Sequence, residues 1–204
     1  MKNLLIVIGC GGHAKSVTDV ILFNDPSKEI IFLDKNAREG ESILGFPVVR
    51  DYEVTNEEVF VAIGDNIKRK IICEKYFNNL VSVVSKRAYL GKNTSIGKGV
   101  FVAHNAHIGI LSTIKDFSVI NTSASIDHEC TVGIAATIAP GAVLCGKVIV
   151  GNNSWIGANA VVRENTSITD NVIIGMGATV VKNVINEGTY VGCPIRLINS
   201  PSNK

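Results

Sequence analysis

INTSASIDHECTVGIAATIAPGAVLCGKVIV occupies residues 120–150, and every sixth residue of this stretch is Ile, Val or Leu. The same spacing holds without a slip from residue 90 to residue 180. Sixteen consecutive aliphatic hits have a chance probability of about 10⁻⁸, so the spacing is an internal repeat. The repeated positions are Leu90, Ile96, Val102, Ile108, Ile114, Ile120, Ile126, Val132, Ile138, Leu144, Val150, Ile156, Val162, Ile168, Ile174 and Val180.

The six-residue period predicts short strands that meet at corners. An amphipathic helix repeats near 3.6 residues and a half-buried strand repeats every second residue, so neither explains the spacing. The residue two places before each aliphatic position is never larger than Val, and both side chains point inward on one pleat. Three strands close a triangular coil of about 18 residues, and sixteen repeats stack into about five coils. The sequence therefore predicts a parallel β-helix with an aliphatic core.

The corners of this β-helix carry their own pattern. The residue after each aliphatic position is often Gly, as at Gly91 and Gly109, or a small polar residue such as Asn121 or Asp127. We expect these residues to adopt the unusual backbone angles that a tight corner requires.

The composition bounds the class of protein. A chain of 204 residues makes one or two domains, and a net charge of +2 with 19% charged residues gives no nucleic-acid or membrane footprint. The first twelve residues contain an apolar run that soon meets glycines, so we expect a strand there and no signal peptide. The five cysteines form no CxxC pair and are expected to be free thiols of a cytoplasmic protein: Cys10, Cys73, Cys130, Cys145 and Cys193.

Strand and helix patterns alternate ahead of the repeat. This alternation is typical of βαβ units with a parallel sheet. The expected strands are Asn3–Ile8, Glu29–Leu33, Phe46–Val49, Val59–Ile63 and Leu80–Val84. The first expected helix ends near Asn24 and has Val17, Val20 and Ile21 on one face. The second covers Asn66–Phe77, with Ile67, Ile71 and Glu74 in helical spacing. We therefore predict an α/β half-Rossmann domain at residues 1–86, followed by an all-β β-helix domain with a C-terminal tail at residues 87–204.

A glycine-rich turn follows the first expected strand. Gly9, Gly11 and Ala14 satisfy the G-x-G-x-x-G/A pattern, and Asp34 lies at the distance expected for a ribose-binding acid. About 85 residues supply only half of a Rossmann sheet, which suits a mononucleotide or a sugar nucleotide with its pyrophosphate at the helix N-terminus. The alternative is a tight turn without a ligand.

A second turn could line the same crevice. Gly64, Asp65 and Asn66 follow another expected strand. A ligand role and an ordinary helix cap by Asp65 or Asn66 are both open.

The most informative residues of the repeat are Asp127, His128 and Glu129. Ile126 is an aliphatic position and Cys130 a small inward one, so His128 and Glu129 lie on an outward corner. A neighbouring carboxylate there can fix the tautomer of the imidazole and raise its basicity, which makes His128 a candidate general base. The competing interpretation is a solvated histidine beside two surface acids.

Two alternative chemistries are disfavoured by the spacing. His104 and His107 do not lie a whole number of coils from His128, so the three do not converge on a zinc ion within one chain. Ligands from a neighbouring subunit stay open, although surface histidines explain them more simply. Cys130 points inward, which argues against a cysteine that carries an acyl group during a transfer reaction. If the chain transfers an acyl group, direct transfer from a bound thioester is simpler.

With these motifs assembled, the chain resembles bacterial sugar-nucleotide acetyltransferases of the hexapeptide-repeat family. These enzymes modify UDP-4-amino-sugars for glycan assembly, as in lipopolysaccharide or capsule, and related members acetylate perosamine or sialic acid. The resemblance covers essentially the whole chain. It is carried by GCGGHAKSV at 9–17, FLDKN at 32–36, VAIGDN at 61–66, INTSASIDHEC at 120–130 and YVGCPIR at 190–196.

The resemblance implies a left-handed β-helix, a homotrimer and a set of site residues. His128 would be the general base and Glu129 its support. Residues that would hold the nucleotide sugar are Gly11, Gly12, His13, Asp34, Lys35, Gly64 and Asp65. Acetyl-CoA, the only cosubstrate implied, would lie between two subunits near Thr137, Gly146, Ala158 and Met176.

Two positions depart from the family pattern. Relatives often carry a second histidine near the acetyl group where this chain has Thr137, whose hydroxyl would have to donate to the thioester carbonyl instead. Lys35 replaces an acid of close relatives, which can alter the preferred base or sugar.

The sequence thus predicts a metal-free, cytoplasmic N-acetyltransferase that moves acetyl from acetyl-CoA to the amine of a nucleotide-linked 4-amino-sugar. Neither nucleic acid nor membrane is an expected partner. Three alternatives stay open: an O-acetyltransferase of the sialic acid type, a zinc carbonic anhydrase, and a sensor that binds a sugar nucleotide without catalysis.

Overall fold

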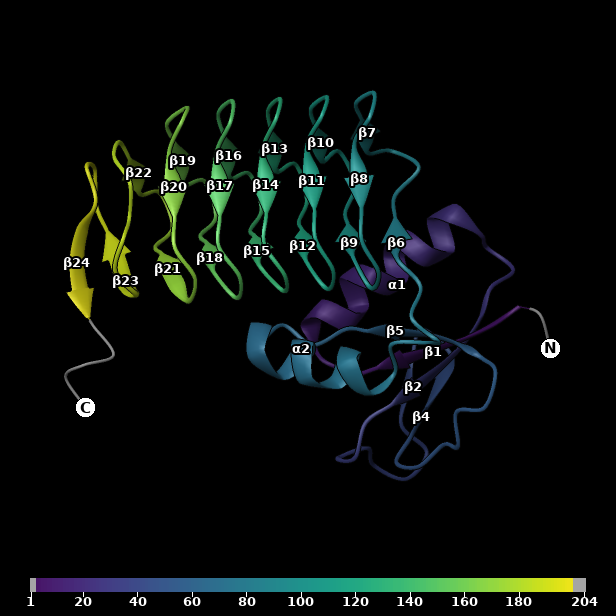
Figure 1. The fold of residues 1–204 in the computed structure, drawn as a ribbon. Coiled ribbons are helices and arrows are strands. Elements are labelled where there is room, and N and C mark those ends of the chain that lie inside the picture. Colours follow the sequence, from purple (N-terminus) through teal and green to yellow (C-terminus); the bar gives the residue numbers. More distant parts are fainter. Residues whose placement is uncertain (1–2, 200–204) are drawn as a thin grey trace.

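The computed structural model describes residues 3–199, in which a small α/β domain lies beside a long β-prism (Figure 1). The α/β domain has one sheet in the order β3-β4-β2-β1-β5, parallel except for β3. Its elements are β1 (Leu4–Ile8), α1 (Gly12–Asn24), β2 (Glu29–Leu33), β3 (Ser42–Ile43), β4 (Phe46–Val49), β5 (Glu58–Val61) and α2 (Asn66–Lys75). The predicted half-Rossmann sheet is confirmed.

The two helices differ in how well their buried faces follow the sequence pattern. Helix α1 buries Val17, Val20 and Ile21, as the helical spacing predicts. The helix predicted over Asn66–Phe77 is confirmed as α2, but Ile67 and Ile71, which have helical spacing, are 58% and 60% exposed. Helix α2 instead buries Asn66, Arg69 and Cys73, since these are the side chains that meet the prism. A polar interface with backbone carbonyls favours donors over aliphatic groups there.

The prism begins at β6 (Val83–Val84), the C-terminal end of the strand expected at Leu80–Val84. Residue Leu80 itself makes an isolated bridge to Val59 of the N-terminal sheet. Because β6 already pairs with β9, the prism's hydrogen-bonded sheet starts before residue 87. Division of the chain at residues 86 and 87 stays a prediction.

Each of the sixteen aliphatic positions lies in its own short strand. The strands are β7 (Tyr89–Leu90), β8 (Ser95–Ile96), β9 (Phe101–Val102), β10 (His107–Ile108), β11 (Thr113–Ile114), β12 (Val119–Ile120), β13 (Ser125–Ile126), β14 (Thr131–Val132), β15 (Thr137–Ile138), β16 (Val143–Leu144), β17 (Ile149–Val150), β18 (Trp155–Ile156), β19 (Val161–Val162), β20 (Ser167–Ile168), β21 (Val172–Ile174) and β22 (Thr179–Val180). Parallel pairing joins residues 18 apart, as Ile114 pairs with Val132. The left-handed parallel β-helix is confirmed.

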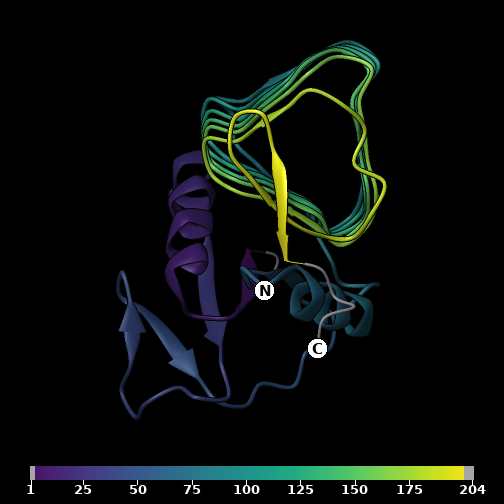
Figure 2. The ribbon, with the colours of Figure 1, turned by 90° about the vertical axis from the view of Figure 1, so that its left-hand side faces the viewer.

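Three sheets form the faces of the prism, and Figure 2 shows their triangular section. One face is β7-β10-β13-β16-β19-β22, and the second is β8-β11-β14-β17-β20. The third contains β6-β9-β12-β15-β18-β21-β23-β24, where β23 (Gly188–Val191) is parallel to β21 and β24 (Arg196–Asn199) is antiparallel to β23.

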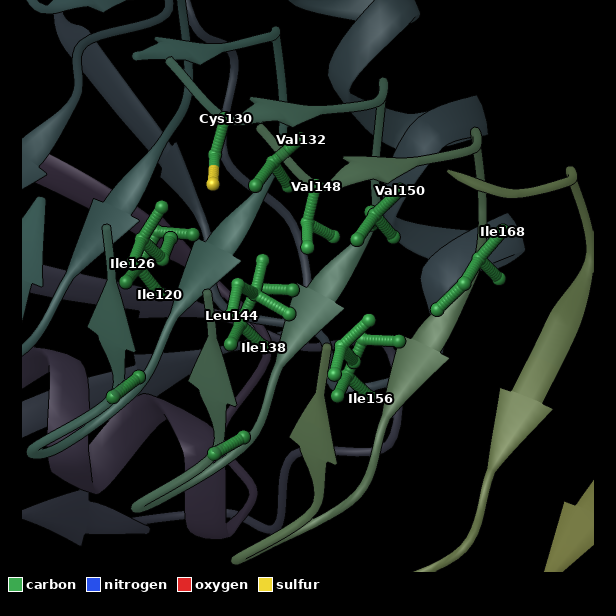
Figure 3. Packing of buried hydrophobic residues seen from close by; sticks show 14 of the residues in the cluster. Ile120, Ile126, Cys130, Val132, Ile138, Leu144, Val148, Val150, Ile156 and Ile168 are labelled. Atoms are coloured by element: carbon green, nitrogen blue, oxygen red, sulfur yellow. The ribbon is translucent and has the colours of Figure 1, made fainter. Parts of the chain in front are cut away.

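The interior of the prism is mainly aliphatic, with small buried polar side chains such as Ser112, Ser118 and Ser154 at some inward positions. Ile126, Ile138 and Leu144 have no exposed surface, and Figure 3 shows these side chains converging with the thiol of Cys130. Leu90 is an exception at 41% exposed, because it lies in the first of the sixteen repeats, at the end of the stack. Burial raises the pKa of the Cys130 thiol to about 11. Cys130 is therefore a core residue and no nucleophile, as its spacing predicts.

The glycines directly after the aliphatic positions are not explained by unusual backbone angles, contrary to the expectation from the sequence. Positive φ angles lie three residues after each aliphatic position from Leu90 to Ile174, as at Leu111 (60°) and Glu129 (59°). The glycine directly after the aliphatic position has no such φ; a Cβ at Gly91 would lie 2.5 Å from the backbone nitrogen of Ile110 in the next coil. Glycine is needed there because stacked corners touch backbone to backbone.

The N-terminal domain packs on the third face of the prism. Phe101, Val119 and Ala103 share a buried cluster with residues of α1 and the N-terminal sheet, and Phe117 and Ala135 share one with α2. Figure 2 shows both helices beside this part of the prism. Within the described residues no helix combines the length and the apolar character that a membrane crossing requires.

Candidate active site

The outward corner between β13 and β14 carries a histidine–carboxylate pair. Nδ1 of His128 lies 3.0 Å from Oε2 of Glu129, and both side chains are about half exposed. In the neutral imidazole Nδ1–H donates to the carboxylate, which leaves the lone pair of Nε2 free to accept a proton. Asp127 has a different task, since its Oδ1 accepts from the backbone N–H of His128 at 2.7 Å. Glu129, rather than Asp127, is the carboxylate that contacts the imidazole and would fix its tautomer.

Gly146 lies directly beside the free nitrogen of His128. A Cβ built on Gly146 would lie 2.5 Å from Nε2 and 2.6 Å from Cε1 of the imidazole. The position one coil further along thus has to be glycine for the ring to lie where it does. Lys147, the next residue, places its Nζ 3.8 Å from Oε2 of Glu129.

Gly146→Ala is expected to displace the imidazole without unfolding the protein. Gly146 has no left-handed φ, so alanine adds a steric contact with a half-exposed ring and little backbone strain. If His128 is the base that the sequence predicts, the predicted acetyl transfer is expected to fall by up to about 10²-fold, since a misplacement of about 1 Å can cost that much. Steady-state kinetics measures the loss, and thermal melting serves as the control. Unchanged kcat in a variant with an unchanged melting temperature would contradict this role of Gly146.

The glycine-rich turn opens helix α1 without a side-chain cap. Gly11 is the N-cap residue, makes no capping side-chain bond, and the first turn contains no acid. Gly9 has a φ of 99°, and a Cβ there would lie 3.1 Å from the carbonyl oxygen of Ala62, so the first glycine of the motif is a steric requirement. Exposed glycines at 11 and 12 leave the first backbone N–H groups accessible, an arrangement that suits an anion such as a phosphate.

Asp34 ends β2 on the same edge of the sheet as the glycine turn. Its Oδ1 accepts from the backbone N–H of Asn36 at 2.9 Å, and its Oδ2 accepts from the thiol of Cys10 at 3.3 Å. These bonds, with the backbone N–H of Asn36 first, hold the pKa of the carboxyl below its usual range. A pocket of about 400 Å³ lies nearby, lined by Cys10, Lys15 and the segment 41–44. Lys35 is exposed.

The second turn does line a pocket with the first. Gly64, Gly12, His13 and Thr137 surround a space of about 240 Å³ between α1, α2 and the third face of the prism. The remaining lining residues are Ser16, Arg69, Val119, Asn121 and Trp155. Asp65 is also the N-cap of α2, with Oδ1 accepting from the N–H of Lys68 at 2.8 Å. The cap interpretation therefore holds for its side chain, while Gly64 faces the pocket.

Thr137 belongs to a buried polar network in this pocket. Its side chain is 2% exposed, and its hydroxyl donates to Oδ1 of Asn66 at 2.7 Å. Nη2 of Arg69 donates to the same hydroxyl oxygen at 3.1 Å. In this arrangement the hydroxyl proton is already used, so donation to a thioester carbonyl would need Asn66 to move. A contact of Thr137 with acetyl-CoA stays a prediction.

His13 is held neutral at the edge of the pocket. Burial, followed by the charge of Arg69, lowers its pKa to about 4. Its ring packs edge-on against Phe101 with centroids 5.3 Å apart, and its buried Nε2 has no hydrogen-bond partner among the described residues. A neutral imidazole is therefore available to a bound ligand at neutral pH.

The two halves of the predicted site do not meet within one chain. His128 lies at the corner between the first and second faces of the prism, whereas the pocket with Gly12 and Gly64 lies against the third face. That corner is opposite the third face of a triangular prism (Figure 2). Of the residues predicted to hold acetyl-CoA, Gly146 shares the corner of His128, while Ala158 and Met176 follow β18 and β21 at another corner. Met176 is 83% exposed.

The other prism histidines have structural partners. His104 is not a free surface residue: Nδ1 lies 2.6 Å from Oγ of Ser85, and Nε2 lies 3.3 Å from Oδ2 of Asp19 on α1. The serine is 2% exposed, so this set links the two domains and offers no accessible nucleophile. His107 stacks on Tyr89 with ring centroids 4.9 Å apart. Residues 3–199 contain no cluster of three potential metal ligands.

The most informative residues absent from the sequence prediction are Arg69 and Trp155. Arg69 lies three residues beyond Asn66 and one turn after Asp65 on α2. Apolar periodicity could not identify it, because the interface it enters is made of carbonyl oxygens. Trp155 lies in register with Phe101, Val119 and Thr137, which point outward from the third face at intervals of eighteen residues. This spacing could have identified Trp155 as a residue beside Thr137.

Comparison with known proteins agrees with this fold. Residues 4–76 match the family model of the PglD N-terminal domain, and residues 147–182 match that of the bacterial transferase hexapeptide (six repeats). The acetyltransferase domain of PglB from Neisseria gonorrhoeae is 30% identical, with a TM-score of 0.90, and the match covers 96% of this chain and 100% of that domain. The same domain has also been solved in complex with acetyl coenzyme A.

A second relative extends the comparison. A variant of perosamine N-acetyltransferase from Caulobacter crescentus, solved with CoA and GDP-perosamine, is 30% identical with a TM-score of 0.86. The match covers 96% of this chain and 97% of that one. The chain belongs to the hexapeptide-repeat family of sugar acetyltransferases. It also aligns, at 36% identity over 124 residues, with a quarter of the length of the uncharacterized protein L142 of Acanthamoeba polyphaga mimivirus.

Proposed function

We propose that this protein transfers the acetyl group of acetyl-CoA to the amine of a nucleotide-linked 4-amino-sugar for glycan assembly in the cytoplasm. His128 is the general base. The observation that carries the proposal is the pair of His128 and Glu129, with Nδ1 engaged at 3.0 Å and Nε2 free beside Gly146. The family relatives, one of them solved with both CoA and GDP-perosamine, support the substrate class.

The reaction needs little beyond these groups. The lone pair of the amine attacks the thioester carbonyl carbon, the C–N bond forms, and the C–S bond breaks to release CoA as a thiolate. Nε2 of His128 takes the proton that the nitrogen loses and can pass it to the departing sulfur. Glu129 stabilises the imidazolium that forms. No covalent enzyme intermediate is required, which agrees with the buried position of Cys130.

The nucleotide sugar would bind in the N-terminal domain. Uncapped N–H groups at Gly11 and Gly12 suit the pyrophosphate. Asp34 follows the turn by about the number of residues that separates a ribose-binding acid from the glycine motif. The sugar would then extend into the pocket of Gly12, His13 and Gly64. Lys35 and Asp65 are exposed next to these groups and are retained as candidate contacts.

A homotrimer completes the site in this proposal. Since His128 lies on the opposite side of the prism from its own pocket, the base has to come from a second copy of the chain. A groove of about 500 Å³ beside the pocket is lined by Ile67, Trp155 and Ile173, and the corner of His128 carries the exposed apolar residues Ile110 and Leu111. Apposition of these two surfaces would bury both and would place acetyl-CoA between Gly146 of one copy and Ala158 and Met176 of the next.

A panel assay tests this function. Purified protein with acetyl-CoA is expected to release CoA and to acetylate the amine of a UDP- or GDP-linked 4-amino-sugar, with no metal added. Thermal melting against the same panel is expected to rise with the correct nucleotide sugar, because a ligand of the native state stabilises it. Acetylation of a hydroxyl on free sialic acid would favour the O-acetyltransferase instead. Binding of a nucleotide sugar without consumption of acetyl-CoA would contradict a catalytic role and favour a sensor.

A further inference from the structure

Helix α2 carries a buried arginine that the mechanism above does not use. Arg69 has no exposed surface, although it lines the pocket formed by Gly12, His13 and Gly64. Its Nε donates to the carbonyl of Phe117 at 2.8 Å, and Nη1 donates to the carbonyls of Ile63 and Gly64 at 3.0 and 3.1 Å. Nη2 donates to Asn66, Ala135 and Thr137 at 2.7, 2.9 and 3.1 Å.

All of these acceptors are neutral. Within residues 3–199 no carboxylate lies within ion-pair distance of the guanidinium. Burial lowers the pKa of Arg69 only to about 10, so the group stays charged at neutral pH. A buried cation without a counter-ion is costly, and neutral donors and acceptors could join two domains without that cost. The positive charge therefore needs a reason beyond the hydrogen bonds.

The ionisable groups around Arg69 come from each element packed on it. They are His13 from α1 and Asp65 and Cys73 from α2, while Asp116 of the prism acts on Cys73. Asp65 is exposed and caps α2, while Asp116 accepts from the backbone N–H of Lys98 at 2.8 Å. Burial raises the pKa of the Cys73 thiol to about 12, so it carries no charge. Among the residues that line the pocket, Arg69 is therefore the only one that carries a charge at neutral pH.

We infer that the buried charge of Arg69 holds the amino group of the bound acceptor sugar in its neutral, nucleophilic form. A fixed cation in a site of low dielectric disfavours a second positive charge, so an ammonium entering the pocket loses its proton to solvent. The same field attracts the diphosphate of the substrate. Arg69 is thus a positioning residue that selects a diphosphate-linked, uncharged amine. This inference rests on the proposed function.

His13 responds to the same field and reports it without any substrate. Arg69 is one of the two causes that keep the imidazole of His13 neutral. In the free protein, Arg69→Met removes the charge and is expected to raise the NMR titration midpoint of His13 by up to about one pH unit, because burial is the larger cause of its low pKa. Arg69→Lys keeps the charge and is expected to leave the midpoint low. Lys68→Met removes an exposed charge from the same helix and is the matched control, with no expected shift.

The enzyme reaction gives the second measurement. In the profile of kcat against pH, the acid limb is expected to move up by roughly one to two pH units in Arg69→Met and to stay in place in Arg69→Lys and Lys68→Met. A merely structural role would lower kcat at every pH without moving the limb. Equal acid limbs in wild type and a folded Arg69→Met variant would overturn the inference.

A measurement on the wild type covers the case in which Arg69→Met does not fold. The nucleotide sugar is labelled with ¹⁵N at its amine and bound to the protein in the presence of CoA. Its titration midpoint is expected to lie at least about one pH unit below that of the free sugar. Tight binding with an unshifted or raised midpoint overturns the inference and leaves the proposed function intact. If no nucleotide-linked amino sugar binds, both fail together, whereas His13 still shows whether the field exists.

Discussion

Replacement of His128 by alanine is expected to lower kcat for acetyl transfer by about 10²- to 10⁴-fold, the usual contribution of a general base. The imidazole is the group beside Gly146 whose nitrogen is free to accept the amine proton, and Glu129 has no comparable access once it is paired with Nδ1. Affinity for the nucleotide sugar is expected to stay within a few-fold of the wild type, because the groups proposed to hold its nucleotide, Gly11, Gly12 and Asp34, belong to the N-terminal domain and do not include His128.

The matched control for this variant is His107→Ala. His107 is an exposed histidine of the same prism, stacked on Tyr89 and away from the corner of His128. The His107→Ala variant loses the same type of side chain as His128→Ala and is expected to retain the wild-type kcat. Steady-state kinetics of both variants at saturating acetyl-CoA decides the matter, with thermal melting to confirm folding. Turnover by His128→Ala at the wild-type rate would remove His128 from the mechanism.

Two inactive variants are expected to restore activity when they share one oligomer. Gly64→Trp fills the pocket, and because the space around Gly64 is open and its φ is not left-handed, the variant is expected to fold. His128→Ala keeps the pocket and lacks the base. If each site joins the pocket of one copy to the base of the next, every trimer that contains both variants has one intact site in three, far above either variant alone.

Co-expression with two affinity tags, purification through both and an acetyl-transfer assay measures this recovery. The control is a chain that carries both substitutions, co-purified with His128→Ala. In that mixture every chain lacks the base, so no site can be repaired. A doubly tagged complex of the two single variants that stays at background would show that pocket and base act within one chain, against the opposed positions seen in the fold.

Much of the fold follows from the sequence because its repeat is physically strict. A narrow prism accepts only aliphatic and small side chains at fixed spacing, so the register located the inward Cys130 and the outward corner of His128 without coordinates. The corner glycines were explained wrongly, since backbone contact between coils, rather than φ, excludes a side chain at Gly91. A one-dimensional pattern records that glycine is required and leaves its reason open.

The interface between the domains was less accessible to sequence reasoning. Ile67 and Ile71 have the spacing of a buried face, yet α2 turns its polar side inward. Arg69 finds its acceptors on Phe117, Ala135 and Thr137, which are separated from it by 48 to 68 residues. The positions of these acceptors depend on how the backbone carbonyl groups of the prism are oriented toward α2. Local helix or strand propensity contains no information on that orientation.

The sequence by itself determined the β-helix, the half-Rossmann sheet, the glycine turn and the pairing of His128 with a carboxylate. Each of these depends on spacing along the chain, which periodicity and steric limits translate directly into structure. Only the tertiary structure decided that the base and the pocket lie on opposite sides of one prism, that Thr137 has already committed its proton to Asn66, and that a buried cation faces the pocket. Those facts depend on how two domains pack on each other, and packing between distant segments leaves no period in the sequence.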